Sequence, residues 1–248
     1  MKIMVTGGAG FVGTNLIKRL LKDEPDIIYH LAALPRIQPS FEFPALTMEI
    51  GMLGTMNILE WARKKECKVI YAGSSSVHSG HYENPYTFSK VMGDELCMAY
   101  KQMFGVDAKI CRFYNVYGPH QLTEGEYCTV IGVFERQYAN TELLTITGDG
   151  FQRRDFTHID DIVNGLILTS QSEEFDLDIV ELGRGENHSI NELAEMFSTE
   201  MYPYPTRYIA ERPGEARETL CDTSVAKKDI GYEPKVNLKD YIEEVISE

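Results

Sequence analysis

Several classes of protein are excluded by what this sequence lacks. No apolar stretch is long enough to cross a bilayer, and glycines interrupt the short apolar start that resembles a signal peptide. The five cysteines are scattered and form no CxxC pair, which disfavours a structural zinc site and indicates reduced thiols. We therefore expect a cytoplasmic protein that is not associated with a membrane and binds no metal.

Positive charge is also scarce. The chain has 24 Lys and Arg against 38 Asp and Glu, a formal net charge of -14 at pH 7. A nucleic-acid backbone or an anionic membrane needs a basic surface, so neither is expected as a partner. An anionic ligand would therefore need locally placed arginines. With 248 residues, 43% of them hydrophobic, the chain can bury one sizeable core and a smaller second lobe.

Apolar runs alternate with helical patterns in the first half of the chain, which predicts an α/β fold with a Rossmann-like parallel sheet. The expected strands cover residues 2–6, 26–31, 68–71 and 108–113, and the expected helices cover 11–21, 47–66 and 85–104. Beyond Asn115 the elements become shorter, with helical patterns at 160–170, 189–197 and 237–246. We assign residues 1–114 to the Rossmann-like domain and 115–248 mainly to a smaller substrate lobe, with segments around 154–182 returning to the first domain.

A glycine-rich loop follows the first expected strand. Glycines at positions 7, 10 and 13 would permit a tight turn, a close approach to a pyrophosphate and close packing of the next helix. The positive N-terminal end of that helix would face the anion. The loop therefore predicts a bound dinucleotide. The acid that normally holds its ribose, at the carboxyl end of the second strand, is missing, because Asp23, Glu24 and Asp26 lie at the amino end of that strand.

Tyr86 and Lys90 lie four residues apart, which places a phenol and an ammonium on one face of a helix. The ammonium and a cofactor's positive ring would both lower the pKa of the phenol, so that it could serve as a base. A YxxxK pattern alone is common by chance. The hydroxyls of Ser74, Ser75 and Ser76 follow a strand at the edge where such sheets bind ligands, although a polar loop is the alternative for any one serine.

Together these motifs resemble the extended short-chain dehydrogenase/reductase family, in its branch of NAD-dependent nucleotide-sugar epimerases and dehydratases, which includes UDP-glucose 4-epimerase. The resemblance covers nearly the whole chain. It is carried by TGGAGFVG at 6–13, HLAA at 30–33, SSSV at 74–77, Tyr86 with Lys90, RFYNVYG at 112–118, GDG at 148–150, RDFTHIDD at 154–161 and RPGE at 212–215.

The resemblance implies roles for these residues. The catalytic set would be Ser74, Tyr86 and Lys90. NAD would be held by Gly7, Gly10, Phe11, Val12, Gly13, Leu31, Ala32, Ala33, Tyr86, Lys90 and Tyr114. A nucleotide-diphosphate sugar would be held by Ser74, Ser75, Asn115, Arg154, Arg212 and Arg36. A guanidinium group matches phosphate bidentately, and a surface salt bridge is the alternative for each of the two later arginines.

The residues after the proposed catalytic serine help to decide which reaction of the family this chain would catalyse. Dehydratases of this branch carry an Asp-Glu pair there, because elimination of water needs a further acid and base. This chain has Ser75 and Ser76 instead, which favours an epimerase that passes through a transient 4-keto sugar. The decarboxylases of the branch usually have a glutamate there and are disfavoured for the same reason.

The chain also departs from the family pattern. Only a short stretch separates the first helix from the strand that ends near His30, where the family has a second and a third strand that surround the adenosine. Gly51 replaces a usual asparagine, and Ser74 and Tyr86 are closer together than is typical. Two hypotheses follow: an epimerase with weakened cofactor binding, or a catalytically silent nucleotide-sugar binding protein. An NAD(P)-dependent dehydratase or reductase is a third.

The missing strands would leave the first strand at the end of the sheet. Unpaired strand edges invite pairing, so we expect a covering segment or a neighbouring subunit there. The resemblance implies a homodimer formed through the helices at 47–66 and 85–104. Burial of the second of these helices beneath the second lobe is the alternative.

Overall fold

The computed structural model describes residues 4–7, 9–20, 26–172, 179–198 and 203–247, with no side-chain description for 17–20. Five parallel strands form the central sheet in the order β1-β2-β3-β4-β9. They are β1 (Met4–Thr6), β2 (Ile27–His30), β3 (Lys68–Ser74), β4 (Ala108–Phe113) and β9 (Ile179–Leu182). The predicted α/β class with a parallel sheet is confirmed. Within the described residues β1 lies at one end of the sheet, whereas the absence of two family strands stays a prediction.

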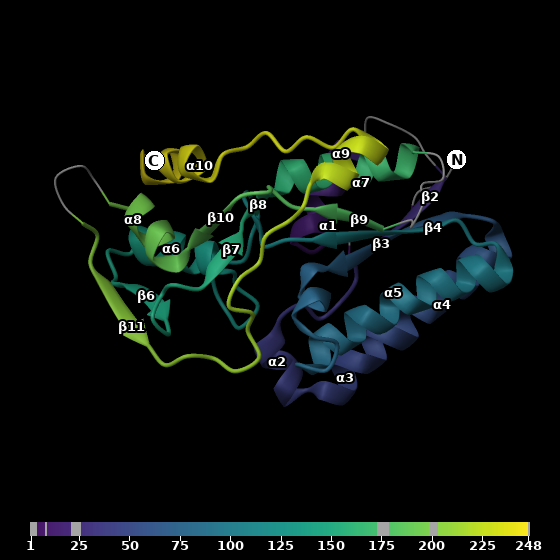
Figure 1. Cartoon of the computed structure of the whole chain (residues 1–248), viewed down its shortest axis with the longest axis horizontal. Coiled ribbons are helices and arrows are strands. Elements are labelled where there is room, and N and C mark those ends of the chain that lie inside the picture. Colours follow the sequence, from purple (N-terminus) through teal and green to yellow (C-terminus); the bar gives the residue numbers. More distant parts are fainter. Residues whose placement is uncertain (1–3, 8, 21–25, 173–178, 199–202, 248) are drawn as a thin grey trace.

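Helices cover both faces of this sheet (Figure 1). α1 (Phe11–Leu20) and α7 (Ile159–Gln171) lie on one face, where Leu16, Ile162 and Leu166 pack with Tyr29 in one core cluster. α4 (Gly54–Lys65) and α5 (Pro85–Phe104) lie on the other face, and Leu59 and Cys97 pack there. Ile28 and Tyr29 point to opposite faces, as consecutive strand residues must.

The second lobe is built from short pairs of strands around its own core. β6 (Leu144–Thr147) pairs with β11 (Thr206–Ile209), β7 (Arg153–Asp155) with β10 (Asn187–Ser189), and β5 (Val116–Tyr117) with β8 (Thr157–His158). α6 (Val130–Ala139), α8 (Ile190–Met196) and α10 (Leu238–Ser247) supply most of the remaining core, including Phe134, Leu193 and Ile242. α7 and β9 return to the central sheet, and α9 (Ser224–Ile230) packs with them.

Two expected elements differ from the prediction. The helix predicted over 47–66 is three consecutive pieces: α3 (Pro44–Met48), a π-helical turn (Glu49–Leu53) and α4. Close packing accounts for Gly51 in that turn, because a Cβ there would lie 2.8 Å from the Cβ of Ser89 on α5. The strand predicted to end at Tyr71 continues to Ser74. The short helix α2 (Ile37–Glu42) was not predicted.

Candidate functional site

Ser74 is the last residue of β3, at the carboxyl edge of the sheet. Its hydroxyl donates to Ser76 Oγ over 3.0 Å and accepts from the Ser76 amide over 3.2 Å, which caps the 3-10 turn Ser75–Ser79. Ser74 is also close enough to Tyr86 to lower the pKa of the phenol. The serine is therefore held beside the phenol that the YxxxK pattern indicated.

Tyr86 lies in the first turn of α5. Asn84 caps this helix, since its side-chain oxygen accepts from the Thr87 amide over 2.8 Å, and Pro85 occupies the first helical position. The Tyr86 amide donates to Ser40 Oγ over 3.1 Å, which ties α5 to α2. The helix cap and the hydrogen bond to Ser40 together fix the backbone position of Tyr86.

The pKa of Tyr86 is raised, because burial outweighs the opposing effects of the Ser74 hydrogen bond and the charge of Arg36. Arg36 is thus a cation that lowers the pKa of Tyr86, and the sequence had not indicated it. Lowering by Lys90 and a bound cofactor stays a prediction. Activation of Tyr86 as a base therefore depends on Arg36 and on what binds beside the phenol.

Lys90 follows one helical turn later and is buried. Its Nζ donates to the Ala72 carbonyl over 2.7 Å and lies 5.1 Å from the centre of the Tyr71 ring. Burial lowers its pKa to about 8, against the opposing influence of Asp94. The ammonium therefore reaches the same end of β3 that carries Ser74.

The glycine loop has the geometry of an anion cradle. Gly7 has a φ of +72°, and a Cβ there would lie 3.0 Å from the Ala32 nitrogen. The Gly10 amide donates to the Gly7 carbonyl over 3.0 Å, and the Thr14 amide donates to the Gly10 carbonyl over 2.9 Å as α1 begins. The N-terminus of α1, with Phe11, Val12 and Gly13, thus follows directly on this turn. These residues fit a dinucleotide pyrophosphate.

A hydrogen-bonded chain joins β1 and β2 behind this loop. The Ala32 amide donates to Thr6 Oγ1 over 3.3 Å, and Thr6 Oγ1 lies 2.7 Å from His30 Nδ1. His30 Nε2 lies 3.0 Å from Thr55 Oγ1, which donates to the Gly51 carbonyl. Because the Thr55 hydroxyl gives its proton to Gly51, His30 Nε2 must be the donor to Thr55 and carries the ring proton. Burial lowers the pKa of His30 to about 4, so the ring is neutral near neutral pH. These hydrogen bonds hold the backbone of Leu31, Ala32 and Ala33 in place where it leaves β2.

Two of the predicted substrate arginines lie near one carboxylate. Arg154 NH2 is 3.6 Å from Glu215 Oε2, and the charge of Glu215 also acts on Arg36. Burial lowers the pKa of both guanidinium groups. Arg36 Nε donates to the Tyr127 carbonyl over 3.0 Å, and its φ of +107° is strained for a residue with a side chain.

The other predicted substrate residues are placed less directly. Asn115 Nδ2 donates to the Asp155 carbonyl over 2.9 Å and to Thr219 Oγ1 over 3.1 Å, so this amide holds the second lobe to the sheet. Arg212 is exposed in the loop before β-bridge residue Glu218. The structure thus brings Arg36 and Arg154 together more clearly than Arg212.

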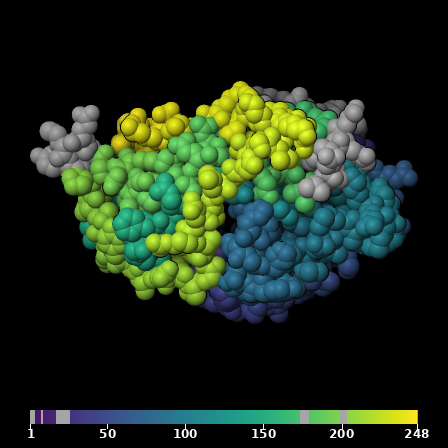
Figure 2. Space-filling model, viewed as in Figure 1, coloured from purple at the N-terminus to yellow at the C-terminus, as the bar shows by residue number. Residues whose placement is uncertain are grey.

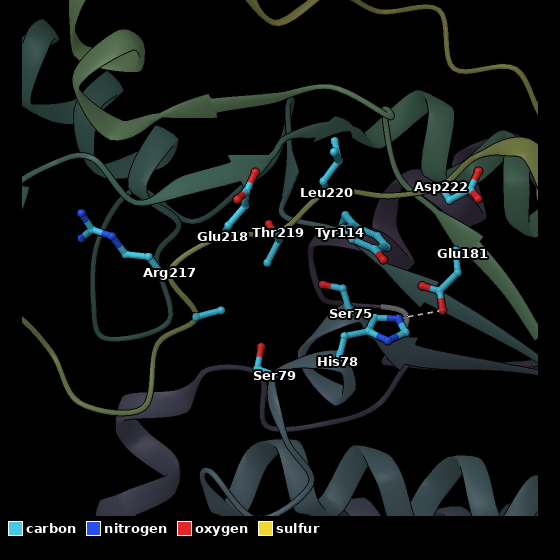
Figure 3. Close-up of a pocket in the computed structure, with 11 residues that line it drawn as sticks. Ser75, His78, Ser79, Tyr114, Glu181, Arg217, Glu218, Thr219, Leu220 and Asp222 are labelled. Carbon is cyan, nitrogen blue, oxygen red and sulfur yellow. Dashed lines mark hydrogen bonds and ion pairs between the residues drawn. The ribbon is translucent and has the colours of Figure 1, made fainter.

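A cavity of about 510 Å³ opens between the carboxyl edge of the sheet and the segment 216–222. Figure 2 shows the surface hollowed where this yellow-green segment faces the blue segment around residue 80. Figure 3 shows Ser75 and Tyr114 turned toward it, with His78 and Glu181 at one side. Its lining is Ser75, His78, Ser79, Tyr114, Glu181, Ala216, Arg217, Glu218, Thr219, Leu220 and Asp222. His78 and Glu181 were not predicted.

Residues 17–183 match the NAD dependent epimerase/dehydratase family. The chain belongs to this family. It is 28% identical to a putative UDP-glucose 4-epimerase of Methanocaldococcus jannaschii, over 99% of this chain and 97% of that protein. It is 26% identical to UDP-glucuronic acid decarboxylase 1 of Danio rerio, over 99% of this chain and 72% of that protein.

A solved relative gives the same fold. The UDP-glucuronic acid 4-epimerase of Bacillus cereus, crystallised with UDP-glucuronic acid and NAD, has a TM-score of 0.89 and 25% identity, over 100% of this chain and 98% of that chain. The expected family and its NAD dependence are confirmed. The archaeal alignment spans 301 positions, more than the 248 residues here, so that relative carries positions without a counterpart in this family member. No described helix is long and apolar enough to cross a membrane.

Proposed function

We propose that this family member is an NAD-dependent epimerase of a nucleotide-diphosphate sugar, acting at C4 through a transient 4-keto sugar. The observation that carries the proposal is the convergence of three groups on the end of β3. Ser74 ends the strand, Tyr86 lies close enough to it for the serine to lower the pKa of the phenol, and Lys90 binds the Ala72 carbonyl two residues earlier.

Each of these groups has a distinct task. NAD, when bound, accepts a hydride from the sugar carbon and returns it. Tyr86 removes the proton of the reacting hydroxyl, while Ser74 donates a hydrogen bond to the same oxygen. Lys90 holds the nicotinamide ribose with the protons that Ala72 leaves free. Ser74 and Lys90 are buried and Tyr86 is half-buried, which limits the access of water to these groups.

The diphosphate is assigned to Arg154, Arg36 and Arg212. In the structure Glu215 lies beside the first two, and a bound diphosphate would take over this role as their anion. The cavity in Figure 3 adjoins Ser74 through Ser75 and is proposed to receive the hexose. Its hydroxyl and carboxylate lining suits a polyhydroxylated ligand.

A dehydratase is less well supported. Glu181 and His78 do stand beside Ser75 in the cavity and could in principle supply an acid and a base. Burial raises the pKa of Glu181, but hydrogen bonds from His78 and Arg112 outweigh this effect and hold it below its ordinary value. A carboxylate paired in this way is a poor proton donor at neutral pH.

The test is direct. Purified protein is incubated with NAD and a panel of UDP- and GDP-sugars, and proton NMR follows the anomeric signals. We expect interconversion of one C4 pair, for example UDP-glucose and UDP-galactose. NAD binding without conversion of any sugar would support the silent binding protein, and a dehydrated product would support the dehydratase.

The proposed partner in solution is a second copy of the chain. Large apolar side chains are exposed along the π-helical turn, α4 and α5: Leu53, Met56, Trp61, Met98, Met103 and Phe104. The family resemblance favours a homodimer through these helices. Sedimentation should show a dimer that Trp61→Glu with Met103→Glu dissociates, whereas Phe151→Glu, on the exposed surface of the other lobe, should not. A monomeric wild-type protein would contradict this proposal.

A further inference from the structure

We propose that Asp94 is a positioning residue for Lys90, held in place by Arg112 and Glu181. The inference rests on the proposed function, because it assigns to Lys90 a role toward the cofactor. Lys90 and Asp94 are one turn apart on α5, and 6% and 3% of their surfaces are exposed. An ammonium and a carboxylate buried this deeply each need a nearby opposite charge.

One oxygen of Asp94 is fully used by Arg112. Oδ2 accepts from Arg112 Nε over 2.9 Å and forms an ion pair with Arg112 NH2, also over 2.9 Å. The other oxygen, Oδ1, is buried without a hydrogen-bond partner. A Cβ built on Gly73 would lie 3.2 Å from Oδ1, so this oxygen faces the backbone of β3 beside Ala72. Because Lys90 Nζ binds the Ala72 carbonyl, the free carboxylate oxygen and the ammonium face neighbouring residues of one strand.

Arg112 and Glu181, on β4 and β9, set the orientation of the Asp94 carboxylate. Arg112 on β4 donates through NH1 to Glu181 Oε1 on β9 over 3.0 Å. The same oxygen lies 2.9 Å from His78 Nε2, at the edge of the cavity. Arg112 is therefore clamped between two carboxylates, and its fork cannot turn away from Asp94. The charges alternate along the row Lys90, Asp94, Arg112 and Glu181, which leaves this row formally neutral.

Titratable groups on β2, β3, β4, β9 and α5 face Lys90 or Asp94. Lys90 faces Tyr71 on β3, His30 on β2, and Asp94 and Cys97 on α5. Asp94 faces Arg112, Glu181 and Lys90, and Tyr71 as well. His30 is neutral, and burial raises the pKa of Tyr71 and Cys97, so neither is ionised near neutral pH. Asp94 is thus the anion that opposes the effect of burial on Lys90.

The experiment measures NAD binding by calorimetry across pH in wild type, Asp94→Asn and Glu95→Gln. Glu95 is the next residue and is exposed, which makes it a matched control. Removal of a neighbouring anion should lower the pKa of Lys90 by about one unit or more. We therefore expect the alkaline loss of NAD affinity to begin at lower pH in Asp94→Asn. Binding should be about tenfold weaker near pH 8.5 and nearly unchanged near pH 6.5.

Two further measurements separate this role from a structural one. Arg112→Lys keeps the cation beside Asp94 but loses the fork, so it should lower stability without moving the alkaline limb. The alkaline limb of kcat/KM should move in Asp94→Asn as NAD binding does. An Asp94→Asn protein that binds NAD with the wild-type pH dependence, whatever its stability, overturns the inference.

The outcomes also separate the inference from the proposed function. Wild-type protein that binds NAD but converts no sugar refutes the epimerase and leaves the role of Asp94 to be decided by the pH comparison. Wild-type protein that binds no NAD overturns both.

Discussion

β3 and β1 lie in one sheet with only β2 between them, yet they support the proposed reaction very differently. Six of the seven residues of β3 are buried, and it carries Ser74 at its end and the carbonyl that holds Lys90. The three residues of β1 are all half-buried, and β1 ends the sheet within the described residues. The reacting groups are therefore rigidly supported, whereas the loop for the pyrophosphate rests on a short marginal strand. Changes near β3 should lower turnover, and changes near β1 should weaken cofactor binding.

The largest effect is expected at the phenol. Tyr86→Phe removes the proton acceptor while the helix cap and packing stay, so kcat should fall by about 10²- to 10⁴-fold. NMR of sugar interconversion measures it, and circular dichroism checks the fold. Tyr82→Phe, at an 87% exposed tyrosine four residues earlier, is the control. Unchanged turnover in Tyr86→Phe would remove this residue from its proposed role.

A change at β1 should act on the cofactor. Gly7→Ala places a methyl group 3.0 Å from the Ala32 nitrogen at a φ of +72°, so the loop must shift. We expect the Kd of NAD to rise about tenfold to a hundredfold, with kcat at saturating NAD largely kept. Gly105→Ala has a similar φ of +70° and no atom within 4 Å, which isolates the backbone strain. Equal Kd values for the two variants would show that the cradle does not contact the cofactor.

Arg154, which pairs with Glu215, should affect substrate binding and not the chemical step. Arg154→Gln removes one charge-assisted contact to the diphosphate and should raise KM about tenfold, with a small effect on kcat. Steady-state kinetics measures it. Arg207→Gln is the control, because that arginine is exposed on β11 and does not line the cavity. If KM responds equally to both substitutions, the effect is one of net charge.

The smallest effect concerns His30, which joins β1 to β2. In the folded protein the pKa of His30 is about 4, below the ordinary histidine value of 6.5. Below pH 6.5 the unfolded chain therefore binds more protons, and the protein loses stability as the pH falls. His30→Gln should remove this dependence. The free energy of unfolding of wild type relative to His30→Gln should therefore fall by about 1 kcal/mol from neutral pH to about pH 5.5. A difference that does not vary with pH would contradict a buried neutral imidazole.

The sequence predicted those parts of the site that depend on local spacing. Tyr86 and Lys90 share a helical face, and the glycines that form the cradle are spaced three residues apart in the chain. The end of β3 at Ser74 was missed because small residues do not continue the apolar pattern that marks a strand. The Gly51 contact was missed because the close neighbour, Ser89, belongs to another helix.

The contacts among His78, Arg112 and Glu181 could not be predicted either, because these residues are far apart in the sequence. His78 and Glu181 are 103 residues apart in the chain, and Arg112 and Glu181 are 69 apart. None of the three stands in a spacing that indicates a pair. The pairing of β4 with β9 brings Arg112 beside Glu181, and the 3-10 turn after β3 brings His78 to the same carboxylate. The sequence likewise could not show that the charge of Arg36 acts on Tyr86, because the two residues are 50 positions apart.

The most direct test of the account follows one atom. UDP-glucose carrying deuterium at C4 is converted in ordinary water, and the product is examined by mass spectrometry and NMR. If hydrogen is withdrawn from C4 and returned within one shielded site, the product keeps its deuterium at C4. Loss of the deuterium to solvent would contradict the account.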